Sequence, residues 1–139
     1  MYTIELIKKE DMGIIIPLLQ NLNPKIELDV LEQRVNEMLL SNYECVGVFD
    51  DKKLIGISGL WILTKYYVGK HIEPDNIYIL DQYQGKGIGK QLMEWIFKYA
   101  KSKGCVASEL NCYLENTSGH KFWEQNGYKK IAYHFSKKL

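Results

Sequence analysis

The sequence lacks the features that would direct it to a membrane, to nucleic acid or to an oxidising compartment. No apolar run approaches the roughly 18 residues of a membrane span, and the run from Ile14 to Leu19 is interrupted by Pro17. Arg34 is the only arginine, and a net charge of +1 is small for a protein that binds nucleic acid through phosphate contacts. Residues 1–10 alternate in polarity, unlike the apolar core of a signal peptide.

Cysteine and histidine are also scarce. The three cysteines are odd in number and form no CxxC pair, so we expect reduced thiols in a cytoplasmic protein. His71, His120 and His134 share neither a metal-ligand spacing nor a cysteine partner, so the sequence predicts no metal site. The 139 residues, of which 46% are hydrophobic and 25% charged, are sufficient for a packed core. We therefore expect one domain over residues 1–139.

Hydrophobic periodicity predicts alternating strands and helices along the chain. Strands are predicted at 1–8, 43–49, 54–63, 72–80, 105–114 and 128–135, and helices at about 10–22, 27–40, 88–103 and 117–125. Pro17 is expected to kink or restart the first helix, and Gly56 and Gly59 suggest a bulge or a close backbone approach. The mixed order with hairpins indicates an α+β fold with helices packed on a sheet, and argues against a doubly wound parallel sheet.

The strongest local feature is a glycine-rich loop between a predicted strand and a predicted helix. Its sequence is Gln84-Gly85-Lys86-Gly87-Ile88-Gly89-Lys90. Glycines let backbone N–H groups turn toward one point, and the helix start adds unpaired N–H groups and a positive dipole end. The loop therefore predicts a phosphate or pyrophosphate site. The alternative is a turn that only reverses the chain.

Two familiar nucleotide loops do not fit this sequence. A Walker A loop ending at Gly89-Lys90 would need glycine at position 84 and serine or threonine at 91, where Gln84 and Gln91 stand. A dinucleotide fingerprint would need a third glycine where Lys90 or Leu92 stands.

Two segments resemble the signatures of the GCN5-related N-acetyltransferases, the GNAT superfamily. Gln84-x-x-Gly87-x-Gly89 matches the Q/R-x-x-G-x-G/A motif, and the run Ile77–Tyr83 is similar to the hydrophobic strand before it. The places of the second signature are taken by Asn116, Gly119, Phe122, Trp123, Gly127 and Tyr128. The resemblance covers nearly the whole chain. It implies the GNAT acyl-CoA N-acyltransferase fold, a mixed, mostly antiparallel twisted sheet with splayed central strands and flanking helices, and acetyl-CoA in the gap.

The resemblance also implies which residues bind the cofactor. The strands 72–80 and 105–114 would part, and the exposed backbone of the first would pair with the pantetheine amides. Lys86 and Lys90 would meet phosphate charge or serve as solvated surface charges, and Asn116 would reach the cofactor arm or cap the next helix. The implied cofactor-binding residues are Ile77, Ile79, Gln84, Gly85, Lys86, Gly87, Ile88, Gly89, Lys90, Asn116 and Trp123.

Acetyl transfer to an amine needs a neutral amine, a polarised thioester carbonyl and a stabilised thiolate. The resemblance implies that the backbone N–H of Ile79 serves the carbonyl. Glu73 and Asp75, on the strand that leads to the splay, are the candidates to take the amine proton, although relatives often carry an acid where Asn76 stands. A polar kink at a strand edge explains these two acids equally well.

The general acid departs from the pattern of the family. Many relatives place a tyrosine near the sulfur, where this chain has Trp123. An indole N–H donates a hydrogen bond but is too weak an acid to protonate a thiolate. Tyr113, Tyr128 or Tyr133 would then substitute, or water or the departing ammonium would supply the proton. Trp123 is otherwise a core aromatic residue.

The sequence thus predicts a cytoplasmic N-acetyltransferase that moves an acetyl group from acetyl-CoA to a primary amine. The segment 120–139 is similar to small-molecule amine acetyltransferases, such as those of aminoalkylphosphonates. Loops at 21–29 and 65–75 would recognise the acceptor, with Glu27 and Asp29 attracting a cationic amine or simply starting a helix. The alternatives are a protein or peptide N-acetyltransferase and a non-catalytic acyl-CoA-binding domain. We expect no nucleic-acid or membrane partner, and a homodimer is compatible with the sequence.

Overall fold

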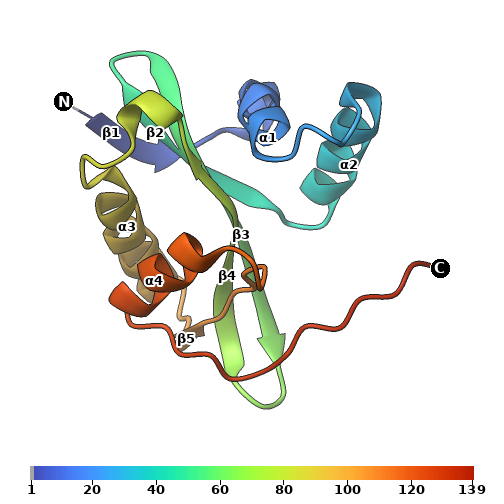
Figure 1. Ribbon diagram of the computed structural model, residues 1–139, viewed down its shortest axis with the longest axis vertical. Coiled ribbons are helices and arrows are strands. Elements are labelled where there is room, and N and C mark those ends of the chain that lie inside the picture. The colour runs from blue at the N-terminus through green and yellow to red at the C-terminus, as the bar shows by residue number, and fades with distance from the viewer. Residues whose placement is uncertain (1) are drawn as a thin grey trace.

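The computed structural model describes residues 2–139, which form a five-stranded sheet with helices on both faces (Figure 1). The strands are β1 (Tyr2–Leu6), β2 (Glu44–Asp50), β3 (Lys53–Lys65), β4 (Gly69–Ile79) and β5 (Ala107–Ser108), in that order across the sheet. The first four pair antiparallel, and β5 runs parallel to β4. This confirms the predicted α+β class. Met1, where the first strand was predicted to begin, lies outside the described residues.

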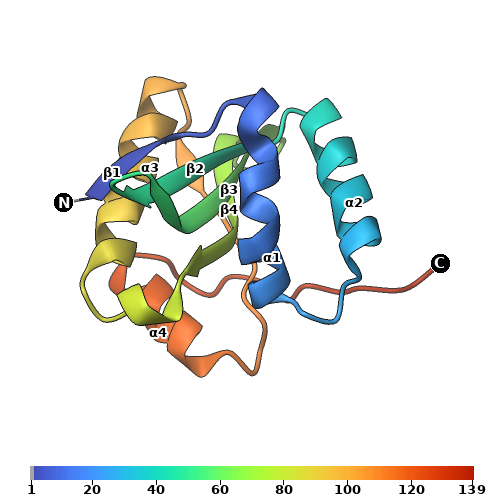
Figure 2. The ribbon, with the colours of Figure 1, turned by 90° about the horizontal axis from the view of Figure 1, so that it is seen from above.

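The helices divide between the two faces of the sheet. They are η1 (Lys9–Ile15, a 3-10 helix), α1 (Ile16–Leu22), α2 (Leu28–Leu40), η2 (Asp81–Tyr83, a 3-10 helix), α3 (Ile88–Ser102) and α4 (Thr117–Gln125). Figures 1 and 2 show α1 and α2 on one face and α3 and α4 on the other. No helix within residues 2–139 is both long and apolar enough to cross a membrane.

The predicted restart at Pro17 is confirmed. The 3-10 turns of η1 end at Ile15, and α1 begins at Ile16 with the proline in its first turn. A proline is tolerated there because the first N–H groups of a helix have no partner within the helix.

Alternation along the strands builds two cores. Val46 and Val48 of β2 pack with α3 residues such as Leu92 on one face. Cys45, the residue before Val46 in the chain, packs on the other face with residues of α1 and α2, including Val35. Because both faces of the sheet are covered, the middle of β2 and of β3 is continuously buried.

A bulge in β4 reshapes the sheet at its middle. Ile57 of β3 lies opposite Tyr78 and Gly59 lies opposite Asp75, so β4 carries an extra residue across from Ser58. Asn76 within this bulge has a positive φ of 44°. The close approach predicted at Gly59 is confirmed, because a Cβ there would lie 2.6 Å from Asn76 Oδ1. Bulges of this kind bend a strand and increase its twist.

Of the two strands predicted near the C-terminus, one is much shorter than predicted and the other does not form. The predicted strand 105–114 is reduced to Ala107–Ser108, and no strand is assigned to 128–135. Tyr133 and Phe135 are exposed instead of packed. A strand needs a partner for its backbone groups, and β4 pairs with β5 only at His71 and Ile72. Alternating polarity alone does not supply such a neighbour.

Candidate cofactor cleft and acceptor face

A cleft of about 750 Å³ opens between the end of β4, the glycine loop and α4. It lies beyond the last contact of β4 with β5, where the Glu109 N–H donates to the Ile72 carbonyl at 3.0 Å. The lining residues are Ile77, Tyr78, Ile79, Tyr83, Gln84, Gly85, Gly87, Ile88, Gly89, Lys90, Phe122, Gln125 and Asn126. Most of the residues predicted to bind a cofactor line this cleft, while Lys86, Asn116 and Trp123 do not.

The glycine loop presents unpaired backbone donors to the cleft. Gly85 and Gly87 have positive φ angles of 76° and 78°, and a Cβ on either would meet no atom within 4 Å. Within residues 2–139, no hydrogen bond forms from the backbone N–H groups of residues 85–90, and the first bond of the helix runs from Gln91 to the Gly87 carbonyl at 3.2 Å. Open space, free N–H groups and the positive end of the α3 dipole together suit an anionic ligand.

Gln84 and Gly89, the other two residues of the motif, have structural roles. Gln84 Nε2 donates to the Ile79 carbonyl at 2.8 Å and to Asp81 Oδ1 at 3.3 Å, which ties the loop back to the end of β4. Gly89 permits packing, because a Cβ there would lie 3.0 Å from the Phe122 ring. Thus Gly85 and Gly87 open the loop, while Gly89 lets α4 approach α3.

The backbone of β4 offers a donor to the cleft at Ile79. The Leu80 N–H donates to the Ile55 carbonyl of β3 at 2.9 Å. The preceding Ile79 carbonyl therefore points away from β3, where Gln84 meets it. Since the N–H and C=O of one strand residue point to the same side, the Ile79 N–H also faces away from β3.

The two lysines of the motif differ in their surroundings. Lys90 lines the cleft in the first turn of α3. Lys86 Nζ lies 5.5 Å from the centre of the Tyr83 ring, which Lys53 approaches at 5.8 Å. Tyr83 is in turn held by a hydrogen bond from its hydroxyl to Asp50 Oδ2 at 2.8 Å. Lys86 is therefore placed at the rim of the loop by a cation–π contact.

Asn116 and Trp123 occupy structural positions at the start and in the middle of α4. Asn116 Oδ1 accepts the Gly119 N–H at 3.0 Å, so it caps the helix, as one of the two sequence interpretations predicted. The Trp123 side chain is only 9% exposed and packs edge-on against Phe122 and Tyr128 at 4.9 and 5.4 Å. Their predicted roles in cofactor binding remain predictions.

Three lining residues at the C-terminal end of α4 were missed by the sequence interpretation. They are Phe122, Gln125 and Asn126. Gln125 and Asn126 follow Phe122 by three and four residues, and residues at this spacing share one face of a helix. That periodicity was available in the sequence.

The tyrosines proposed as acids lie away from the cleft lining. The Tyr128 hydroxyl and Ser108 Oγ are 2.6 Å apart, and the ring also packs 6.1 Å from Phe97. Burial raises the pKa of Tyr128, and its hydrogen bond with Ser108 opposes that rise. Tyr113 and Tyr133 are exposed. The role of Tyr128 as an acid therefore remains a prediction.

The indole of Trp123 lies beside the half-buried Cys112 thiol. Burial raises the pKa of the Cys112 thiol, while Lys130 and a hydrogen bond with Trp123 act in the opposite direction. This contact favours the interpretation of Trp123 as a core aromatic residue.

The two candidate carboxylates lie toward the other face of the sheet, beside α2. Glu73 Oε2 is 2.8 Å from His71 Nε2 and 3.4 Å from Lys65 Nζ. The carboxylate of Asp75 is exposed, and its Oδ2 accepts the Trp61 indole N–H at 3.1 Å. These contacts leave Asp75 Oδ1 without a partner among residues 2–139.

A second hollow of about 490 Å³ lies on this face. Its lining residues are Ser41, Asn42, Trp61, Ile62, Leu63 and Glu73. Of the residues predicted to recognise an acceptor, Glu73 lines it, while Glu27 and Asp29 lie at the opposite end of α2. β4 therefore separates a glycine-lined cleft from a face that carries carboxylates.

Comparison with known proteins gives two relatives that act on small amines. The chain is 30% identical over 67 residues to the aminoalkylphosphonate N-acetyltransferase of Salmonella typhimurium. This aligned region is 48% of this chain and 44% of that protein. It is 30% identical over 102 residues to the spermidine N(1)-acetyltransferase of Thermoplasma acidophilum. This aligned region is 70% of this chain and 60% of that protein. The chain thus spans about half the length of these relatives.

A solved structure resembles the whole chain, and a family pattern matches most of it. An aminoglycoside N-acetyltransferase solved in complex with CoA superposes with a TM-score of 0.85 over 100% of this chain and 95% of that one; at 19% identity, this shows a shared fold. Residues 15–128 match the pattern of the Acetyltransferase (GNAT) family. Because this match includes both the glycine loop and α4, the protein belongs to the GNAT family of acetyltransferases.

Proposed function

We propose that the protein transfers an acetyl group from acetyl-CoA to a primary amine of a small molecule. The observation that carries this proposal is the row of unpaired N–H groups at residues 85–90, placed at the end of a cleft that follows Ile77–Ile79. The two relatives named for aminoalkylphosphonate and spermidine favour a small amine as the acceptor.

The cleft fits the parts of acetyl-CoA. The N–H groups of the glycine loop would bind the pyrophosphate, with Lys90 in the same turn adding positive charge. The backbone of Ile77 and Ile79 would pair with the pantetheine amides in the manner of an added strand. Bound acetyl-CoA would supply an activated acyl group as a thioester. The Ile79 N–H would then donate to the negative charge that develops on its carbonyl oxygen.

The amine would reach the reaction from the face that carries the carboxylates. Asp75 is the better candidate to accept its proton, because it is exposed and its Oδ1 has no partner among residues 2–139. Glu73 already has one oxygen between His71 and Lys65. The Tyr128 hydroxyl is paired with Ser108 and the Trp123 indole is buried, so we infer that water or the departing ammonium supplies the proton for the thiolate.

Calorimetry with CoA, followed by measurement of CoA release from acetyl-CoA with a panel of amines, tests the proposal. We expect CoA to bind and small primary amines to give the fastest release. Release with peptides alone would favour the protein or peptide N-acetyltransferase. Binding without release for any amine would favour a non-catalytic acyl-CoA-binding domain. Absence of CoA binding would contradict the proposal.

A further inference from the structure

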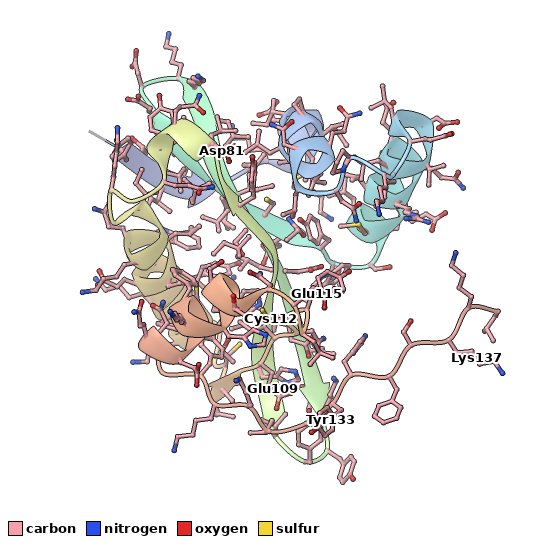
Figure 3. The ribbon with its side chains drawn as sticks, in the orientation of Figure 1. Asp81, Glu109, Cys112, Glu115, Tyr133 and Lys137 are labelled. Atoms are coloured by element: carbon pink, nitrogen blue, oxygen red, sulfur yellow. The ribbon has the colours of Figure 1, made fainter. Side chains whose placement is uncertain are left out.

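His71, Glu73 and Glu109 form a compact group of metal-ligating side chains where β4 and β5 meet. One ligand atom from each lies within 4.8 Å of the other two. His71 and Glu73 are two residues apart on β4 and so share one side of the strand. Glu109 follows β5 directly, and its N–H bonds to the Ile72 carbonyl at 3.0 Å. Figure 3 shows Glu109 beside the lower part of β4.

The imidazole of His71 is oriented as a metal-binding histidine would be. Its Nδ1 lies 2.9 Å from the Gly69 carbonyl oxygen. A carbonyl oxygen only accepts, so we assign the hydrogen to Nδ1. Nε2 faces the carboxylates, at 2.8 Å from Glu73 Oε2 and 3.9 Å from Glu109 Oε1. A carboxylate oxygen also only accepts, so without a metal Nε2 carries a second hydrogen that it donates to Glu73, and a bound metal would displace that proton. Histidine ligands commonly donate their other ring N–H to a backbone carbonyl in this way.

The carboxylates have outer partners of their own. The Tyr67 hydroxyl donates to Glu109 Oε1, and Lys65 Nζ lies 3.4 Å from Glu73 Oε2. Hydrogen bonds to ligating carboxylates are the usual second layer of a metal site. They restrict the rotation of both side chains before any ligand arrives.

Burial makes a cation at this point favourable. The His71 side chain is fully buried, and those of Glu73 and Glu109 are 23% and 19% exposed. Two carboxylates held close together with little solvent require positive charge beside them, which His71 carrying both ring hydrogens and Lys65 supply in the absence of a metal. A divalent ion would supply more charge at the same point. Lys65, whose side chain is 44% exposed, pairs with Glu73 from the rim. The residual exposure of the glutamates leaves a route by which an ion can enter.

We propose that His71, Glu73 and Glu109 bind a divalent first-row transition-metal ion, with Zn²⁺ the best match. One imidazole nitrogen and two carboxylate oxygens are ligands that Zn²⁺ takes at tetrahedral sites, and a fourth position would remain for water. The ion would join β4 to the residue after β5 at their last point of contact. It would thereby hold in place the point at which the cleft opens. This inference does not depend on the proposed acetyl transfer.

Binding of Co²⁺ and Zn²⁺ to the full chain tests the site without an activity assay. The protein is dialysed against a chelator, then titrated with Co²⁺ in a visible absorption cell and with Zn²⁺ in a calorimeter. We expect one equivalent to bind, a d–d absorption band of a low-coordinate Co²⁺ ion, and a higher Tm in the presence of Zn²⁺, since a ligand of the native state stabilises it. No binding of either ion would overturn the proposal.

Paired variants localise the ion. Glu109→Gln keeps the size of the side chain and should weaken Zn²⁺ binding at least tenfold and remove the rise in Tm. Glu115→Gln, which removes a carboxylate outside the group (Figure 3), should leave both unchanged. Equal binding by Glu109→Gln and wild type would overturn the site. If Glu109→Gln fails to fold, as judged by circular dichroism, Glu73→Gln provides the same two readouts with the same expected losses.

Discussion

The two sides of β4 are built in different ways. On the side of α3, the cleft uses backbone groups of a contiguous loop, together with the apolar side chains of Ile77 and Ile79. On the side of α2, the polar groups are side chains such as Asp75, positioned by contacts with residues of β3. Backbone recognition suits the invariant part of a reaction, whereas side chains adapt to a particular acceptor. Variants on the two sides should therefore change different kinetic quantities.

The largest expected effect is on the carboxylate side. Asp75→Asn should lower turnover by roughly 10²-fold, since a positioned base contributes about that much. CoA affinity should stay within about twofold, because Asp75 does not line the cleft. Steady-state kinetics and calorimetry measure the two quantities.

Glu73→Gln is the matched variant for that experiment. Its carboxylate is already paired with His71 and Lys65, so a smaller loss of turnover is expected. A large loss for Glu73→Gln with little change for Asp75→Asn would exchange the two roles.

The next effect is on the loop side. Gly87→Val should weaken CoA binding at least tenfold, about 1.4 kcal/mol. The side chain would occupy the open space in front of the loop, and the φ of 78° strains a β-branched residue. Gly13→Val is the control, since Gly13 also faces open space but has no positive φ. Unchanged CoA binding by Gly87→Val would contradict the phosphate site.

A smaller effect should come from the core beneath the cleft. Trp123→Phe should lower the free energy of unfolding by about 1–2 kcal/mol, because part of a buried aromatic side chain is lost. Turnover should change less than about threefold if the indole serves packing alone. Urea unfolding and kinetics test this. A gain in turnover for Trp123→Tyr would instead indicate that a proton donor is missing near the sulfur.

The smallest effect is expected at the rim of the loop. Lys86→Ala should weaken CoA binding by about two- to threefold and less at high salt, because exposed charges interact weakly and are screened. Lys53→Ala, which removes the other cation from the Tyr83 ring, should leave CoA affinity unchanged. If both variants lose CoA affinity equally, the loss would come from a change at Tyr83 and not from the missing charge of Lys86.

Prediction from sequence succeeded where the signal was local. The helix after the glycine loop, the restart at Pro17 and the cap at Asn116 each depend on residues within one or two turns of chain. It was wrong for 105–114 and 128–135, whose alternating side chains suggest strands. A strand also requires a neighbour at hydrogen-bonding distance, which no pattern in one segment can specify.

The sequence by itself determined the glycine loop, because its positive-φ glycines and the helix start are adjacent in the chain. Tertiary structure decided what surrounds β4. The sequence predicted no metal site, since its histidines lack ligand spacing, yet the pairing of β4 with β5 brings Glu109 to His71 and Glu73. Sheet pairing joins residues that are distant in sequence. For that reason the loop can be read directly from the chain, whereas the charged group appears only after folding.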